Sequence, residues 1–341
     1  MPTSSSRQRA TGRVTLADVA RAASVSPITV SRALRGARAV APELVERVRA
    51  AADKLGYIPD PAARALASQR STHVAVLIPM LTNELFVGLI EAVQLSLRRE
   101  GFQTLIGVTH YDPAEEEQLL REQLLHRPAG LLVTGFDHTE ATRQLMARSG
   151  VPCVHLMETS ADEGVYSVGF SQQDAARDLT RHLIERGHRR IAFAAAQLDP
   201  RTLQRQAGWQ AVMQSQGLFD PTLQWMNPAP SSMALGGLMF EQIMGQTPPI
   251  DAIFFCNDDL AQGALLAANR MTIAVPGRVA IVGFNDLRGS DLMLPPLTTV
   301  HTPLTRIGEE AADMLLKLMR QEEVPERCID VGYSLVVRGS T

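Results

Sequence analysis

Two arginines, Arg201 and Arg205, stand four residues apart in a polar segment that follows an apolar run. A guanidinium group donates two parallel hydrogen bonds from a rigid fork, which suits it to a carboxylate. Asn257 and Asn285 follow two other apolar runs, and their amide groups are suited to hydroxyls. These four residues predict a binding site for a small molecule that carries both groups, such as a six-carbon sugar acid.

A second group of candidate residues lies near the N-terminus and is suited to nucleic acid. Arg32 can donate to guanine O6 and N7 or to a phosphate, and Ile28 can contact a thymine methyl group. The residues that share this helix face are Ile28, Ser31, Arg32 and Arg35. The hydroxyl groups that are candidates for phosphate contacts belong to Thr15, Ser26 and Thr29.

Three short helices must position these residues. Thr15 followed by Asp18 has the pattern of a capping box, and Ser26 is a favourable N-cap with Pro27 at the first helical position. A third helix is predicted to begin near Pro42 and to stop at Gly56. The apolar positions at helical spacing are Leu16, Val19, Ala20 and Ala23, then Val30, Ala33 and Leu34, then Leu44, Val48, Ala51 and Leu55. This arrangement predicts a helix-turn-helix whose second helix enters the major groove.

The charge distribution separates this N-terminal segment from the rest. Residues 1–70 hold 12 Arg and Lys against 5 Asp and Glu, whereas the remainder holds 21 basic and 31 acidic residues. A basic module on an acidic body predicts a polyanionic partner for the module alone.

The body of the chain alternates strand and helix patterns. Strands are predicted at residues 74–78, 104–108, 131–134, 151–156, 191–195, 253–256 and 279–283, with helices at 86–99, 174–185, 204–216 and 260–269 between them. Such alternation predicts parallel sheets covered by helices. The strands are too many for one comfortable sheet, so the fold class is α/β with two lobes.

The strings at residues 14–20 and 25–34, and the later string at 55–59, resemble the headpiece of the lactose-repressor/galactose-repressor family. The resemblance runs from about residue 14 to the C-terminus. Ser24 departs from it, because relatives often place Gly or Asn in this turn and Ser tolerates a left-handed backbone less well.

The resemblance implies four parts: a disordered arm at 1–13, the DNA-binding domain at 14–58, a hinge helix at 59–70, and a two-lobed, periplasmic-binding-protein-like domain at 71–341 that binds effector and dimerises. It implies that Leu66 of the hinge wedges between base pairs while Ala63 lets paired hinge helices approach. The resemblance also implies that Pro27 and Tyr57 contact the DNA. A plain linker with Leu66 packed on the body is the alternative.

The resemblance also implies three crossings between the lobes, near Phe170, near Val300 and near the last helix, with the effector in the cleft at the carboxyl ends of the strands. The effector-binding residues it implies are Leu85, Phe86, Met157, Glu158, Arg201, Thr202, Arg205, Asn257, Phe284 and Asn285. The segments 168–170, 198–202 and 256–260 look most like the gluconate- and 2-ketogluconate-responsive repressors of the family.

Other classes of protein fit the sequence less well. It offers no Gly-rich phosphate loop, nucleophile elbow or metal-ligand spacing, which argues against an enzyme, a metal site or a cofactor. The three cysteines are far apart and fit neither a disulfide framework nor a metal site, and no apolar run is long enough to span a membrane. The attached headpiece and the absence of a secretory signal argue against a periplasmic binding protein. We therefore expect a cytoplasmic, nucleoid-associated homodimer or higher oligomer that binds double-stranded operator DNA and an effector. The alternatives are a neutral sugar or a purine as the effector, and an effector that strengthens DNA binding instead of releasing it.

Overall fold

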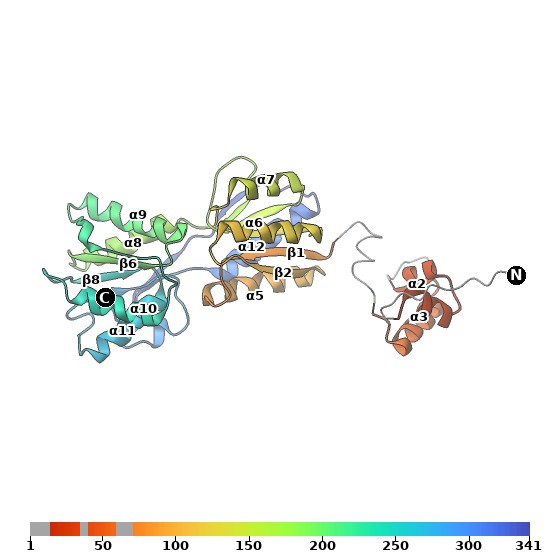
Figure 1. Ribbon diagram of the computed structural model, residues 1–341, viewed down its shortest axis with the longest axis horizontal. Coiled ribbons are helices and arrows are strands. Elements are labelled where there is room, and N and C mark those ends of the chain that lie inside the picture. The colour runs from red at the N-terminus through yellow and green to blue at the C-terminus, as the bar shows by residue number, and fades with distance from the viewer. Residues whose placement is uncertain (1–13, 35–39, 59–70) are drawn as a thin grey trace. The chain divides into compact units, whose positions relative to one another are not determined.

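The computed structural model describes residues 14–34, 40–58 and 71–341 (Figure 1). The chain divides into two compact units, residues 1–70 and residues 71–341, here called the headpiece and the body. The predicted arm at 1–13 and hinge at 59–70 lie outside the described residues, and so do Arg35, Ala63 and Leu66. In the described part of the chain no helix is both long enough and apolar enough to cross a bilayer.

The headpiece consists of α1 (Leu16–Ala22), α2 (Pro27–Leu34) and α3 (Pro42–Leu55). Both halves of the predicted capping box are formed: the Asp18 amide donates to the Thr15 hydroxyl, and Asp18 accepts from the Thr15 amide. The α3 helix ends at Gly56 with a left-handed φ of 64°. The residues buried in the headpiece core are Val19, Ala20, Ala23, Val30, Ala33, Val48 and Ala52.

The inward face predicted for α3 is partly wrong. Leu55 is 37% exposed and lies outside the headpiece core. Ala52 is buried in its place, and Val45 packs partly buried against the same core. Leu55 continues the three- and four-residue spacing of Val45, Val48 and Ala52, but it is the last residue of α3, where the headpiece core no longer covers it.

The first lobe of the body is built on a six-stranded parallel sheet in the order β11-β5-β4-β3-β1-β2. Its strands are β1 (His73–Ile78), β2 (Gln103–Val108), β3 (Gly130–Thr134), β4 (Cys153–Met157), β5 (Ser167–Gly169) and β11 (Cys328–Asp330). Its helices are α5 (Glu84–Arg99), α6 (Pro113–Leu125), α7 (Glu140–Ser149) and α12 (Leu304–Met319). Alternate residues of β1 face opposite layers: Val74 and Val76 share a core with α5 and α12, whereas Ala75 and Leu77 pack with α6 and α7.

The second lobe has a four-stranded parallel sheet in the order β7-β6-β8-β9, with α8 and α9 drawn on one face and α10 and α11 on the other (Figure 1). Its strands are β6 (Ile191–Ala196), β7 (Gln224–Asn227), β8 (Ala252–Phe255) and β9 (Ala280–Val282). Its helices are α8 (Gln172–Glu185), α9 (Pro200–Ser215), α10 (Met233–Met244) and α11 (Asp258–Arg270), with short 3-10 turns η1 (Pro221–Leu223) and η2 (Ser290–Leu292). These two lobes confirm the predicted fold class.

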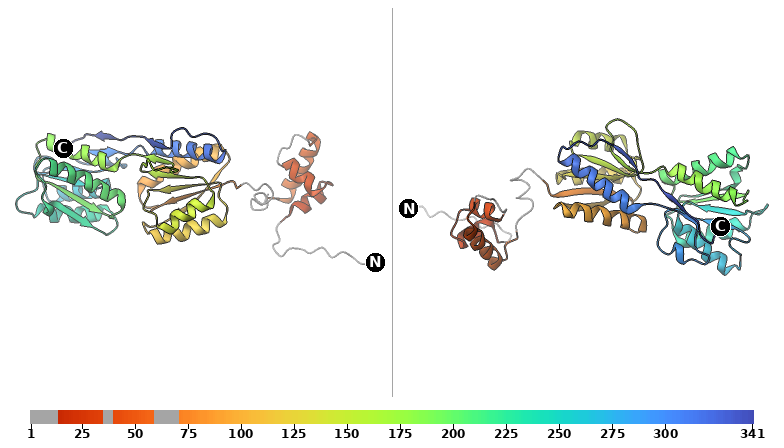
Figure 2. Two further views of the ribbon diagram at one scale, coloured as in Figure 1. Left: turned by 90° about the horizontal axis from the view of Figure 1, so that it is seen from above. Right: turned by 180° about the vertical axis from the view of Figure 1, so that it is seen from behind.

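The chain crosses between the lobes three times. It passes from β5 to α8 at Phe170, from β10 (Thr299–His301) to α12, and from β11 to β12 (Ser334–Val336) after that last helix. The strands β10 and β12 pair in an antiparallel ribbon. Figure 2 shows the blue C-terminal segments running from one lobe to the other. The sequence pattern missed β5, β7, β10, β11 and β12, because strands of three or four residues are too short to show a period.

Candidate DNA interface and ligand cleft

The second headpiece helix presents its predicted contact residues to solvent. Ile28 is 66% exposed, although it is a large apolar side chain, and Arg32 is exposed on the same helix. Ser31 is half-buried. An exposed isoleucine on a basic, helix-turn-helix module is suited to an apolar contact at a base edge.

The headpiece hydroxyls predicted to contact phosphates are held by local hydrogen bonds. The hydroxyls of Ser26 and Thr29 lie 2.8 Å apart, and the Thr29 amide donates to Ser26 at the start of α2, just before Pro27. The Thr15 hydroxyl donates to Asp18 at 2.6 Å. Tyr57 packs partly buried against the headpiece core. The hydrogen bonds at the starts of α1 and α2 therefore position Thr15, Ser26 and Thr29.

In the body, Arg205 of α9 is buried among groups from several elements. Its Nε donates to Gln172 Oε1 at 2.9 Å, and its Nη1 donates to the carbonyl oxygen of Cys256 at 2.6 Å. Its Nη2 donates to Asn285 Oδ1 at 3.5 Å, and its guanidinium carbon lies 3.9 Å from the centroid of the Phe284 ring. The structure thus brings the predicted residues Arg205, Phe284 and Asn285 together.

The charge of Arg205 has no carboxylate beside it. The side chain is only 4% exposed, and none of the ion pairs among the described residues includes it. All three acceptors are neutral, and they occupy three of the five N–H donors of a guanidinium. Burial lowers the pKa of Arg205 below its usual value. The charge of Asp199 acts on Arg205 only from a distance, without an ion pair. A buried cation that pairs with no carboxylate is costly, so this position favours an anionic ligand.

Arg201 lies one turn earlier on α9 and has a different environment. Its Nη1 is 3.4 Å from Glu158 Oε2, and its Nη2 is 3.3 Å from Asp199 Oδ1. Burial opposes the charge of Arg201, but Asp199 and Glu158 more than offset this effect and raise its pKa above the usual value. The two arginines that the sequence placed together as a pair therefore differ: Arg201 faces two carboxylates and Arg205 faces none.

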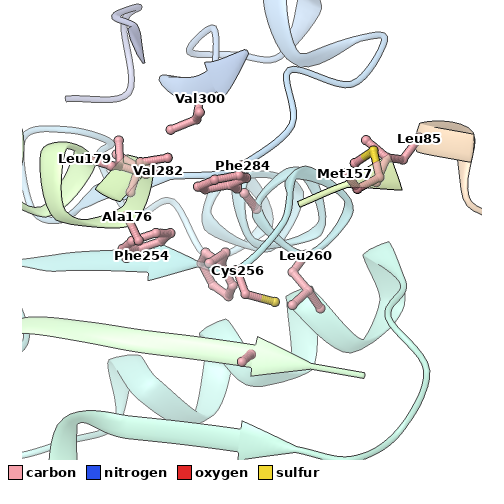
Figure 3. Close-up of a cluster of buried hydrophobic side chains, with 14 of the residues drawn as sticks. Leu85, Met157, Ala176, Leu179, Phe254, Cys256, Leu260, Val282, Phe284 and Val300 are labelled. Carbon is pink, nitrogen blue, oxygen red and sulfur yellow. The ribbon is translucent and has the colours of Figure 1, made fainter. Parts of the chain in front are cut away.

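The remaining predicted cleft residues fall into two groups. Figure 3 shows Leu85 and Met157 from the first lobe in one cluster of buried hydrophobic side chains with Phe284 from the second. Phe86 is buried in the same core. The polar residues Thr202 and Asn257 are bound within their own lobe.

The hydroxyl of Thr202 donates to Asp199 at 3.0 Å. Asn257 caps α11 by accepting from the Leu260 amide, and it also bonds Ser231. These hydrogen bonds of Thr202 and Asn257 do not involve the guanidinium of Arg205. The capping contact of Asn257 is what its place before a helix favours.

Several residues of the cleft were missed from the sequence. Gln172, the first residue of α8, bonds both Arg205 and the carbonyl oxygen of Met157, and no local pattern marks it. Tyr111 lies beneath Arg201, with the guanidinium carbon 5.9 Å from its ring centroid, and burial raises the pKa of Tyr111 to about 12. Asp199 accepts from the Arg201 amide as the N-cap of α9, and its place directly before a proline was a usable signal.

A further carboxylate, Asp258, is fully buried at the start of α11. Its oxygens accept from the Thr299 hydroxyl at 2.6 Å, the Leu287 amide at 2.6 Å and the Ser290 hydroxyl at 3.2 Å. Burial, with the nearby charge of Asp286, outweighs these bonds and raises the pKa of Asp258 to about 6. Asp258 therefore ties α11 to the segments on either side of η2.

Comparisons with known proteins identify both units. Residues 15–60 match the family model described as bacterial regulatory proteins, lacI family, and residues 180–341 match a periplasmic binding protein-like domain. The chain is 50% identical over 333 residues to the HTH-type transcriptional regulator GntR of Pseudomonas aeruginosa, which covers 98% of this chain and 97% of that protein.

Two solved structures are similar as well. The transcription regulator GntR from Chromobacterium violaceum is 45% identical with a TM-score of 0.77, over 79% of this chain and 98% of that one. The lac repressor dimer bound to operator and the anti-inducer ONPF is 26% identical with a TM-score of 0.85, over 96% of this chain and 99% of that one. A helix-turn-helix headpiece on a two-lobed body, with relatives of this identity along nearly its whole length, places the chain in the LacI family of bacterial transcription regulators.

Proposed function

We propose that this regulator represses genes of sugar-acid metabolism, and that a six-carbon sugar acid such as gluconate or 2-ketogluconate releases it from its operator. The observation that carries the proposal is the buried guanidinium of Arg205, which has neutral partners only. A carboxylate would supply the missing negative charge, and the amides of Gln172 and Asn285 beside it would bond hydroxyls.

Release follows from the position of the ligand. A molecule held between two lobes favours one closure angle over another, because it contacts both lobes in only one of them. A change in closure alters the spacing of two headpieces on a two-fold site. We propose at least a dimer that reads a pseudo-palindrome, since one headpiece buries too little DNA for a tight specific complex.

The test is calorimetric titration of the wild type and of Arg205→Ala with gluconate, 2-ketogluconate, glucose and ribose. Loss of one charge-assisted contact weakens sugar-acid binding by about ten- to a hundredfold. Operator binding without sugar acid, measured by gel shift, stays unchanged in the variant. Tighter binding of glucose or ribose than of either sugar acid would overturn the proposed effector class.

A further inference from the structure

The Arg201 side chain crosses from the second lobe into the first. It belongs to α9 of the second lobe, and its partner Glu158 follows β4 of the first lobe. Both side chains are almost fully buried, at 4% and 7% exposed. From the same α9 turn, the Gln204 amide donates to the other carboxylate oxygen of Glu158.

The first lobe forms a socket for this guanidinium, lined by Tyr111, Gly135 and Glu158. Gly135 follows β3 with a left-handed φ of 73°. A Cβ atom at this position would lie 2.7 Å from Arg201 Nη1 and 2.7 Å from Glu158 Oε2. Glycine is therefore needed here for both the backbone and the approach of the ion pair.

We propose that the Arg201–Glu158 ion pair is a latch that holds the two lobes together. While the latch is closed, the effector has little access to Arg205. The reference to the effector rests on the function proposed above; the holding of the lobes does not. Arg205 and Asn285 are both 4% exposed, so a ligand reaches them only when the lobes part. Parting the lobes separates Arg201 from Glu158 and leaves Asp199, on its own lobe, as the nearby carboxylate.

A neighbouring cavity makes such a latch reversible. A cavity of about 860 Å³ in the body is bordered by Glu158 and Gln204, with Ser160 and Asp162 also in its wall. Water in this cavity can hydrate the carboxylate as the ion pair separates. Breaking a buried ion pair is costly when it leaves a charge without water or a partner. Hydration from this cavity avoids that cost when the lobes open.

The structure supplies a matched comparison for the experiment. Arg288 of the second lobe pairs with Glu84 of the first at 3.2 Å, with side chains 84% and 41% exposed. This pair also joins the lobes, but solvent screens it, and such pairs contribute little. Arg201→Gln and Arg288→Gln thus remove the same group from a buried and an exposed cross-lobe contact.

The first measurement is hydrogen–deuterium exchange of the full chain without sugar acid. In Arg201→Gln and in Glu158→Gln we expect about tenfold faster exchange at residues 109–113, 133–138 and 197–203, which contain Tyr111, Gly135 and Asp199 beside the ion pair. Arg288→Gln changes exchange by about threefold or less. Gly135→Ala, which disturbs the pair without removing a charge, reproduces the effect of Arg201→Gln. The double variant of Arg201 and Glu158 is no faster than either single variant.

The second measurement is stopped-flow binding of gluconate. Because only the open form admits ligand, both latch variants raise the association rate about tenfold, whereas Arg205→Ala acts through faster dissociation. Unchanged exchange in both latch variants, or an equal effect of Arg288→Gln, would overturn the latch. If Arg201→Gln instead speeds gluconate dissociation and Glu158→Gln does not, Arg201 is a ligand contact and not a latch. Absence of gluconate binding to the wild type contradicts the proposed effector and leaves the exchange result to decide the latch.

Discussion

The headpiece and the cleft of this regulator position their functional side chains in opposite ways. In the headpiece, the contacts that place Thr15, Ser26 and Thr29 join residues three apart in the sequence, and the contact helix face is exposed. In the cleft, Arg205 bonds residues 33, 51 and 80 positions away and is buried. The DNA-facing surface is therefore a product of local helix chemistry, whereas the surroundings of Arg205 exist only once distant segments of the second lobe have packed together.

The largest expected effect concerns Asp258, which is held in the body by contacts between segments far apart in the sequence. Its pKa of about 6 in the folded body lies above the usual 3.8, so between these pH values the folded state binds more protons than the unfolded state. Raising the pH from 4 to 6 therefore removes about 2 kcal/mol of stability through this group. Asp258→Asn lacks this contribution.

Urea unfolding of the body at pH 4 and pH 7 checks the prediction. The free energy of unfolding of Asp258→Asn, relative to wild type, rises by about 2 kcal/mol between the two pH values. All other titrating groups are common to both proteins and cancel. Parallel pH profiles for the two proteins would show that Asp258 ionises normally in the folded body.

An intermediate effect is expected at the exposed face of the headpiece. Ile28→Ala removes an apolar contact to a base edge, so operator affinity falls about tenfold while binding to unrelated DNA changes little. Stability stays unchanged, because the side chain is already 66% exposed. Ile58→Ala is the matched control, since Ile58 is 83% exposed in the same unit but lies outside α2.

Fluorescence anisotropy with operator and scrambled duplexes measures both affinities. Equal losses on the two duplexes would assign Ile28 to non-specific binding. Equal operator losses in Ile28→Ala and Ile58→Ala would remove the special role of the α2 face.

The smallest effect concerns the turn between α1 and α2. Ser24 adopts a left-handed φ of 54°, a conformation that favours glycine, so the departure of this turn from the family pattern has a cost in strain. Ser24→Gly should stabilise the headpiece by about 0.5 kcal/mol. Glycine removes the backbone strain of the folded turn, and this gain slightly exceeds the cost of the larger conformational entropy that glycine gives to the unfolded chain. Amide exchange in α1 and α2 measures it, and slower exchange is expected. Faster exchange than in wild type would show that the serine side chain stabilises the turn.

The sequence predicted the cleft less completely than the headpiece, for a physical reason. It identified Arg205 and Asn285 because each follows an apolar run, and parallel strands bring their carboxyl ends to one edge of a sheet. It did not identify Gln172 or Tyr111, whose roles depend on the packing of segments far apart in the chain. It also grouped Arg201 with Arg205, since residues four apart on a helix share a face.

The sequence by itself determined the helix starts at Thr15 and Ser26, the alternation of strands and helices, and the residue types that meet in the cleft. Capping and periodicity act within a few residues, so the sequence alone specifies them. Only the tertiary structure decided which arginine is neutralised. Glu158 comes from one lobe and Arg201 from the other, so this ion pair of Arg201 forms only when the two lobes meet, whereas Arg205 bonds neutral groups of its own lobe.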